Sequence, residues 1–324
     1  MKNNTLKFLL ISALLFLGFL QNANAIGETF FVNIMSLDKS PGTTVTYKIT
    51  SFSFDVTKSD ITWVLDGKII ESGVGKKTAE VILPEMGKEK TLSIYINTTN
   101  DVELSKSIIL SGSDVDILLE PQTYTPYWYK GSPLTTIESN LKVVAIPHLF
   151  LDGKKIPSSS LFYQWSLNNK KDLDGSGYGK NSNTFTIKNY GDYVLNLKVY
   201  NKDESVTVEK AIIISANEAE PTVLFYEDHP LFGIMSHIGT QNGLQMFSDI
   251  LKVVAEPFFF SKENLNNLSY EWEMNSNTIL PTENPRVIEF KKPEQGSGVA
   301  DVNLQIQNMS NIFQSASNKF KIIF

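Results

Sequence analysis

Hydrophobic and polar residues alternate along most of the chain after its first 25 residues. The clearest run is the segment 191–201, in which Tyr193, Leu195, Leu197 and Val199 share one face. The same alternation occurs at 44–49 and 92–96. A period of two is the pattern of a half-buried β-strand. No stretch of a dozen residues after the first 25 has helical periodicity, so the sequence predicts an all-β chain.

A ten-residue phrase occurs twice, as LKVVAIPHLF at 141–150 and as LKVVAEPFFF at 251–260. Each copy is followed about twenty residues later by an aromatic residue, a polar residue and a tryptophan, at 163–165 and 270–272, and a weaker third copy lies at 61–63. The tryptophans Trp63, Trp165 and Trp272 stand 102 and 107 residues apart, about the length of one β-sandwich. We therefore expect three tandem immunoglobulin-like β-sandwiches, with these tryptophans in their cores.

The expected domains are 26–113, 114–217 and 218–324, joined at 111–114 and 217–221. In the first domain we expect strands at 44–49, 61–65, 92–96 and 107–110, and a tight turn at Asp66 and Gly67. In the second we expect strands at 115–119, 141–150, 163–165, 185–187, 191–201 and 206–214, and a glycine-rich turn at 172–179. In the third we expect strands at 222–226, 251–257, 270–274, 287–290, 302–306 and 319–324.

The first 25 residues have the features of an export signal. Lys2 and Lys7 precede an apolar run at 8–20, and the small residues Ala23 and Ala25 form a cleavage pattern. The run is shorter than the roughly 20 residues that a spanning helix needs. We expect an exported protein, extracellular, on the cell surface or in the periplasm; the alternative is an uncleaved anchor, with contact to the membrane only through this segment. The chain has no cysteine, so neither a lipid on cysteine nor a disulfide is expected.

One sequence pattern resembles a known family. An aromatic residue two positions before a tryptophan, followed by Gly191, Tyr193, Leu195, Leu197 and Val199, resembles bacterial PKD-type and related Ig-like domains. PKD domains usually have Phe-Gly-Asp-Gly after the tryptophan, whereas Trp165 is followed by Ser-Leu-Asn-Asn, so the broader Ig-like description is preferred. The resemblance covers most of the second and third domains. It implies a spacer, adhesion or scaffold role in surface proteins and no catalytic residues.

Composition and motifs exclude several kinds of chemistry. The net charge of −6 disfavours nucleic-acid binding, which needs clustered basic residues. The three histidines, His148, His229 and His237, lack metal-ligand spacing, so no metal or cofactor is expected. The segment from Asp172 to Asp174 begins like a calcium loop but lacks its later carboxylates, which leaves a hairpin or a weak calcium turn as alternatives. No nucleophile elbow or hydrolase triad is recognisable, so an enzyme is not expected.

Aromatic residues gather in two corresponding loops. The second domain has Tyr124, Tyr127, Trp128 and Tyr129 beside prolines, and the third has Leu231 and Phe232 in the same slot. Exposed rings of this kind bind proteins or glycans because they bury much area at low entropic cost. The alternative is that these loops pack into the next domain and stiffen the array.

We therefore expect a non-enzymatic exported protein that acts as an interaction, adhesion or spacer scaffold. Its expected partner is a cell-envelope or surface protein. The alternative function is a carbohydrate-binding accessory module in which Tyr127, Trp128 and Tyr129 stack on a glycan. A secreted hydrolase would need a convergent polar pocket that the sequence does not indicate.

Overall fold

The structure, a computed structural model, describes residues 29–36, 39–216, 219–237, 240, 243–280 and 283–324. In this part of the chain almost all regular structure is strand, and the helical segments are two 3₁₀ turns, η1 (Ser158–Ser160) and η2 (Lys262–Asn267). The expected all-β fold is confirmed. The expected signal segment, 1–25, lies outside the described residues. Within them no helix has the length and apolar character needed to cross a bilayer.

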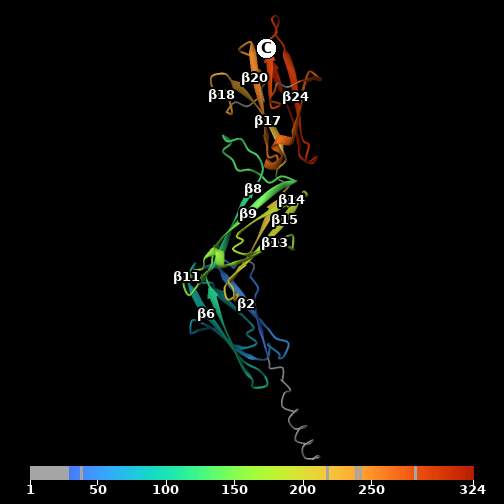
Figure 1. Cartoon of the computed structure of the whole chain (residues 1–324). Helices are drawn as coiled ribbons and strands as arrows, with labels where there is room; N and C mark the ends of the chain where they lie inside the picture. The colour runs from blue at the N-terminus through green and yellow to red at the C-terminus, as the bar shows by residue number, and fades with distance from the viewer. Residues whose placement is uncertain (1–28, 37–38, 217–218, 238–239, 241–242, 281–282) are drawn as a thin grey trace, which may run out of the picture. The chain divides into compact units, whose positions relative to one another are not determined.

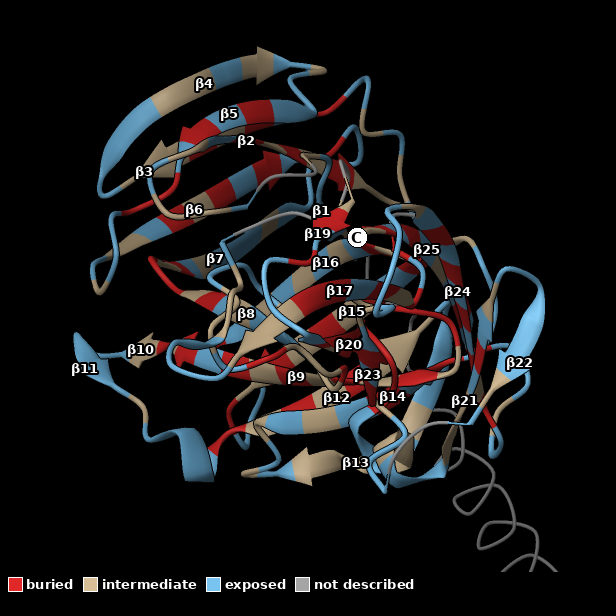
Figure 2. Cartoon of the chain, turned by 90° about the horizontal axis from the view of Figure 1, so that it is seen from above, coloured by how far each residue is buried: buried red, intermediate tan, exposed pale blue. Residues whose placement is uncertain are grey.

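Three β-sandwiches follow one another along the chain (Figure 1). Each repeats the same strand order. The first, second and fifth strands form one sheet, and the third, fourth, sixth and seventh strands form the other in the order 4-3-6-7. Each sandwich encloses its own cluster of buried hydrophobic side chains. The buried and exposed positions alternate along strands such as β5 and β6, as Figure 2 shows.

The first sandwich contains β1 (Phe31–Ile34), β2 (Thr44–Thr50), β3 (Asp60–Leu65), β4 (Lys68–Val74), β5 (Thr78–Ile82), β6 (Glu89–Asn97) and β7 (Glu103–Ser111). The second contains β8 (Asp114–Pro121), β9 (Ser139–His148), β12 (Phe162–Leu167), β13 (Lys170–Tyr178), β14 (Ser182–Ile187), β15 (Asp192–Tyr200) and β16 (Thr207–Ser215). The third contains β17 (Thr222–His229), β20 (Ile250–Phe258), β21 (Leu268–Met274), β22 (Asn277–Ile279), β23 (Val287–Lys291), β24 (Val299–Asn308) and β25 (Ser315–Ile323). Short additions are β10 (Phe150–Leu151), β11 (Lys154–Lys155), β18 (Gly233–Ile234) and β19 (Leu244–Gln245).

The three tryptophans occupy equivalent places on the third strand of each sandwich, and all are fully buried. Each indole N–H donates a hydrogen bond of 2.8–3.0 Å to a backbone carbonyl two residues before the fifth strand. The acceptors are Lys76, Lys180 and Pro285. The tryptophan therefore links the two sheets of its sandwich through a packed ring and one directed bond.

The chain divides into two compact units. The first unit ends at Asp114 and also includes Phe150–Lys155, which holds the β10–β11 hairpin. Inside that unit the Phe150 backbone bonds to the hydroxyls of Ser111 and Ser113. The second unit holds the rest of the second sandwich and the whole of the third, so these two sandwiches pack together as one body.

The strands at the repeated phrase and around the tryptophans lie where the sequence placed them, and Asp66 and Gly67 form the expected two-residue hairpin turn. One expectation is wrong. Residues 172–179 are not a turn, because β13 runs through Lys170–Tyr178 and pairs with β12. That pairing shifts register between Tyr163 and Trp165, which accommodates the glycines that suggested a turn.

Candidate functional site

The aromatic segment of the second sandwich, residues 124–129, lies against the third sandwich. Just before it, Thr123 forms a β-bridge with Ser261. The Tyr124 N–H donates to the Phe260 carbonyl at 2.7 Å, and the Phe259 N–H donates to the Tyr124 carbonyl at 2.7 Å. A short antiparallel pairing therefore joins the two sandwiches, and we call this contact the junction.

The rings of the aromatic segment extend the junction over β17 and β20. Trp128 packs edge-on against Tyr226, with ring centroids 4.9 Å apart, and also meets Phe258 at 6.0 Å. Tyr129 packs edge-on against Phe258 at 5.3 Å. Edge-to-face pairs of this kind add about 0.5–1.5 kcal/mol each beyond the area that they bury. Tyr127, by contrast, is 95% exposed.

Because of this cover, β20 is buried on both faces. All residues from Val253 to Phe258 are buried, whereas buried and more exposed positions alternate along the equivalent β9. The repeated phrase differs at these outward positions. Ile146 and His148 of the second sandwich correspond to Glu256 and Phe258 of the third, which are 4% and 2% exposed.

The backbone of Phe259 is held in a left-handed conformation, with φ +64°. This conformation costs a residue with a side chain about 1–3 kcal/mol, so the surroundings must hold it in place. Besides its bond to Tyr124, Phe259 accepts a bond of 2.9 Å at its carbonyl from the hydroxyl of Thr136, which is fully buried. Its ring meets Tyr129 at 6.2 Å. The junction thus stabilises the unusual turn at the end of β20.

A charged cluster lies at the same place. The Arg286 guanidinium donates to the Glu256 carboxylate, and the Tyr124 hydroxyl donates to the same oxygen at 3.2 Å. Arg286 also lies over the Tyr124 ring, 5.8 Å from its centre. Burial raises the pKa of Glu256 above its ordinary value, although Arg286 and Tyr124 oppose the shift. Arg286 is the only arginine of the chain, and its planar group suits this combined ion-pair and ring contact.

Buried polar side chains complete the junction. The Gln314 amide donates to the Ile137 carbonyl at 2.9 Å, and its oxygen accepts from the Ser261 N–H and the Asn308 amide, each at 3.0 Å. Both Gln314 and Asn308 are fully buried. Buried polar groups with all these partners fix one relative placement of the two surfaces. The junction is therefore a packed internal surface. No sequence pattern pointed to these polar residues, because they come from segments far apart in the chain.

The second aromatic loop lies elsewhere on the third sandwich, at the β17–β18 hairpin. Leu231 and Phe232 are 83% and 74% exposed. The Phe232 ring stacks on His229 with centroids 4.8 Å apart, and His229 Nδ1 accepts a bond from the Leu231 N–H. Phe247 and Ile250, which the sequence analysis did not select, are also exposed. We call Leu231, Phe232, Phe247 and Ile250 the tip surface.

A pocket of about 880 Å³ adjoins the tip surface. Phe247, Ile250 and His229 line it together with the carboxylates of Asp228, Asp249 and Glu289, among other residues. Asp228 forms an ion pair with Lys252 at 3.2 Å. The pocket thus combines the exposed side chains of Phe247 and Ile250 with carboxylate acceptors.

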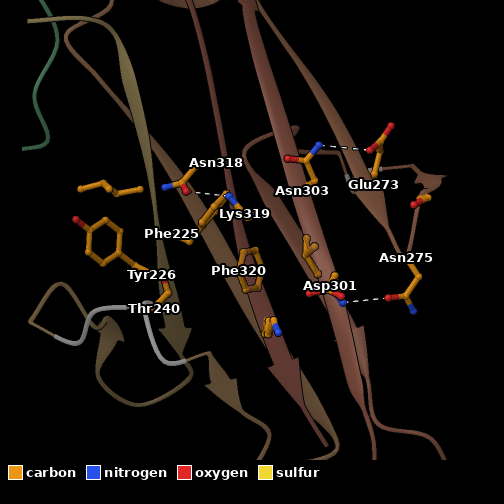
Figure 3. A pocket seen from close by; sticks show the side chains of 14 residues that line it. Phe225, Tyr226, Thr240, Glu273, Asn275, Asp301, Asn303, Asn318, Lys319 and Phe320 are labelled. Carbon is orange, nitrogen blue, oxygen red and sulfur yellow. Dashed lines mark hydrogen bonds between the residues drawn. The ribbon is translucent and has the colours of Figure 1, made fainter.

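A second pocket of the third sandwich, about 820 Å³, is shown in Figure 3. Its polar groups largely bond to one another: Asn303 donates to Glu273, and the Asp301 N–H donates to Asn275 (Figure 3). The rings of Phe225 and Phe320 in its lining are 2% and 4% exposed. This pocket offers no exposed ring face for stacking.

Two of the residues considered for metal binding, Asp172 and His148, have hydrogen-bond partners within the protein. Asp172 accepts bonds from the Gly175 N–H and the Asn183 amide, each at 3.0 Å, and these bonds lower its pKa. His148 bonds to Asp116 at 3.1 Å, and His237 is exposed. Across the described residues, no group of three or more metal-ligating side chains converges.

No family model matches this sequence, and no curated protein matches it. Among solved structures, the fibronectin(III)-like modules of Clostridium thermocellum CbhA match 59% of this chain and 97% of their own, with 13% identity and a TM-score of 0.24. The central fibronectin-III array of RIM-binding protein matches 90% of this chain and 95% of its own, with 11% identity and a TM-score of 0.30. SGBP-B of the Bacteroides ovatus mixed-linkage glucan utilization locus, solved with a mixed-linkage heptasaccharide, matches 90% and 70%, with 12% identity and a TM-score of 0.22.

With TM-scores of 0.22–0.30, these similarities carry no argument about fold or function. The class itself follows from the shared strand order and the three separate cores. The described chain is a tandem array of Ig-like β-sandwiches, as the sequence predicted.

Proposed function

We propose that this protein is a non-enzymatic, exported surface or envelope component that binds a protein partner through the tip surface. The observation that carries the proposal is that one aromatic loop packs against the third sandwich while the other is exposed. Trp128 and Tyr129 contact the third sandwich, whereas Leu231, Phe232 and Phe247 are 74–93% exposed beside a pocket. Large exposed apolar side chains are typical of binding surfaces.

The junction supports the scaffold part of the proposal. It joins the second and third sandwiches by backbone bonds, ring contacts and a buried ion pair, so that they present the tip surface from one stiff body. A preorganised surface loses less entropy on binding than a flexible one.

The proposal is tested by photo-crosslinking in the native cells with a probe at Phe232. We expect one discrete adduct with an envelope protein. A probe at Trp128 is the matched control and should link mainly to the third sandwich of the same chain. The proposal is wrong if the Phe232 probe gives no adduct beyond that of the Trp128 probe.

A glycan partner is the second candidate function, and the tip surface also favours it. Phe232 and Phe247 could stack on sugar rings while Asp249 and Glu289 accept hydroxyl hydrogen bonds. Two of the three rings of the originally expected platform, Trp128 and Tyr129, contact the third sandwich instead. Calorimetric titration with a polysaccharide panel tests this function. Phe247→Ala should abolish any heat of binding, and Tyr127→Ala should leave it unchanged.

A further inference from the structure

The third sandwich covers one edge of its larger sheet with its own chain. The short strand β19 pairs in parallel with β25, joining Leu244 to Ile322 and Gln245 to Ile323. The Met246 N–H continues this ladder by donating to the Ile323 carbonyl at 2.8 Å. Leu244 and Met246 are buried in the core, and Gln245 is exposed. An extended segment with the pattern apolar, polar, apolar therefore completes this edge.

Among the described residues, the same edge of the second sandwich has no such strand. In the second sandwich Trp165 pairs with Leu197, which pairs with Lys210; in the third, Trp272 pairs with Leu304, which pairs with Asn318. Ile214 and Ser215 therefore correspond to Ile322 and Ile323. Among the described residues, β16 is the last strand of its sheet, after β15.

The hydrogen bonds at the two ends of the β15–β16 pairing show which backbone groups of β16 point away from β15. The Ala216 N–H donates to Gly191, and the Asn201 N–H donates to Val206, so even-numbered residues bond to β15. The N–H and C=O groups of Ile213 and Ser215 then point away from the sheet, because successive residues of a strand alternate in direction. The same alternation directs the Ile323 carbonyl toward Met246 in the third sandwich.

A groove of about 780 Å³ lies along this part of β16. Its lining includes Ile213, Ile214 and Ser215 on one side and Leu119, Leu134 and Lys262 around the rest; we call these residues the edge groove. Ile213 is 71% exposed, and Leu119 and Leu134 are each 41% exposed. Apolar walls beside unpaired strand groups are the features that an added strand uses.

The junction explains why the chain leaves this groove open. By the spacing of the repeated phrase, residues 134–136 correspond to 244–246. Instead of pairing with β16, this segment bonds to Thr123 of its own sandwich and to Phe259 of the third sandwich. The Thr123 hydroxyl donates to the Leu134 carbonyl at 2.8 Å, and the Thr136 hydroxyl donates to the Phe259 carbonyl.

We propose that the edge groove binds an extended segment of a partner protein as an added parallel strand on β16. The segment would have apolar side chains at alternate positions, as β19 has, and would bond to the outward groups of Ile213 and Ser215. Lys262, Glu120 and Asp192 at the groove carry both signs of charge, so recognition rests on the backbone and the apolar side chains. The inference depends on the proposed interaction role but uses a surface separate from the tip.

The test uses a labelled peptide that copies residues 243–249, Gly-Leu-Gln-Met-Phe-Ser-Asp, and the whole mature chain. We expect saturable binding by fluorescence anisotropy, with new hydrogen-exchange protection at the Ile213 and Ser215 amides. Replacing the peptide residues that copy Leu244 and Met246 by aspartate should abolish binding.

Ile213→Pro removes an outward N–H without breaking the β15–β16 ladder, and it should weaken binding at least about tenfold. Ile109→Pro is the matched control, because Ile109 holds the equivalent position on β7 and is 62% exposed. It should bind the peptide normally, as should Phe232→Ala. No saturable binding by the parent chain, or equal binding by the Ile213 and Ile109 variants, would overturn the inference. Neither result would contradict the proposed binding at the tip surface, which the Phe232 crosslink tests separately.

Discussion

Each buried tryptophan stabilises its sandwich in two ways, by filling the core and by donating one hydrogen bond, and substitution can separate the two contributions. Trp165→Ala should destabilise the second sandwich by about 3–5 kcal/mol, because it leaves a cavity between the sheets. Trp165→Phe keeps much of the ring but leaves the Lys180 carbonyl without its donor, and it should cost about 1–3 kcal/mol. Urea unfolding of the parent chain and of the two variants measures both changes. A phenylalanine variant as stable as the parent would show that the indole bond contributes nothing.

Glu256 makes the stability of the junction depend on pH. Because burial raises its pKa, the folded state binds this proton more tightly than the unfolded state. The free energy of unfolding should therefore fall as pH rises from the ordinary glutamate pKa of about 4.3 through the raised value.

The matched variant is Glu256→Gln, which cannot titrate. It should flatten this part of the pH profile, because a neutral amide replaces a carboxyl whose neutral form is favoured at this buried site. Thermal melts from pH 4 to pH 8 provide the measurement. An unchanged slope in the variant would assign the pH dependence to other groups.

At the scale of single elements, the aromatic segment offers a direct comparison of two neighbouring rings. Trp128→Ala should lower the stability of the second unit by about 1–3 kcal/mol, since the ring is partly buried against Tyr226 and Phe258. Tyr127→Ala should leave the melting temperature unchanged because its ring is exposed. Calorimetry of both variants tests this difference, and equal melting temperatures would mean that the Trp128 contacts add no stability.

The strands were predictable because their signal is local. Period-two alternation placed β2, β6 and β15, and the repeated phrase placed β9 and β20. The sequence analysis misplaced β13, because Asp172, Gly175 and Gly177 are residues typical of turns. An edge strand whose pairing shifts register tolerates such residues.

The role of the aromatic segment could not be predicted from composition. Rings beside prolines look the same whether they bind a ligand or pack on a neighbouring sandwich. A usable signal was nevertheless present in the repeat. Where the second sandwich has Ile146 and His148 on its outward face, the third has Glu256 and Phe258, which the junction buries. Phe232 was selected for its place in a loop and is 74% exposed. Phe247, which is 93% exposed, was not selected because it lies in a loop with no pattern.

At the scale of the whole molecule, the two compact units should unfold separately. Trp63→Ala removes the central side chain of the first unit and should lower one calorimetric transition only. Trp272→Ala should instead destabilise the body that contains both the second and third sandwiches. A single transition that shifts in both variants would contradict the division into two units.

The dependence of β20 on the aromatic segment also has a consequence for biosynthesis. The segment leaves the ribosome about 120 residues before the strand that receives it. At about 5–20 residues per second, its rings wait roughly 6–25 s for their binding surface. During that interval the second sandwich exposes an aromatic loop without its packing partner, and chaperones bind exposed apolar surfaces of this kind. We therefore expect the yield of correctly folded protein to depend on how quickly residues 137–258 follow the aromatic segment to the place where the chain folds.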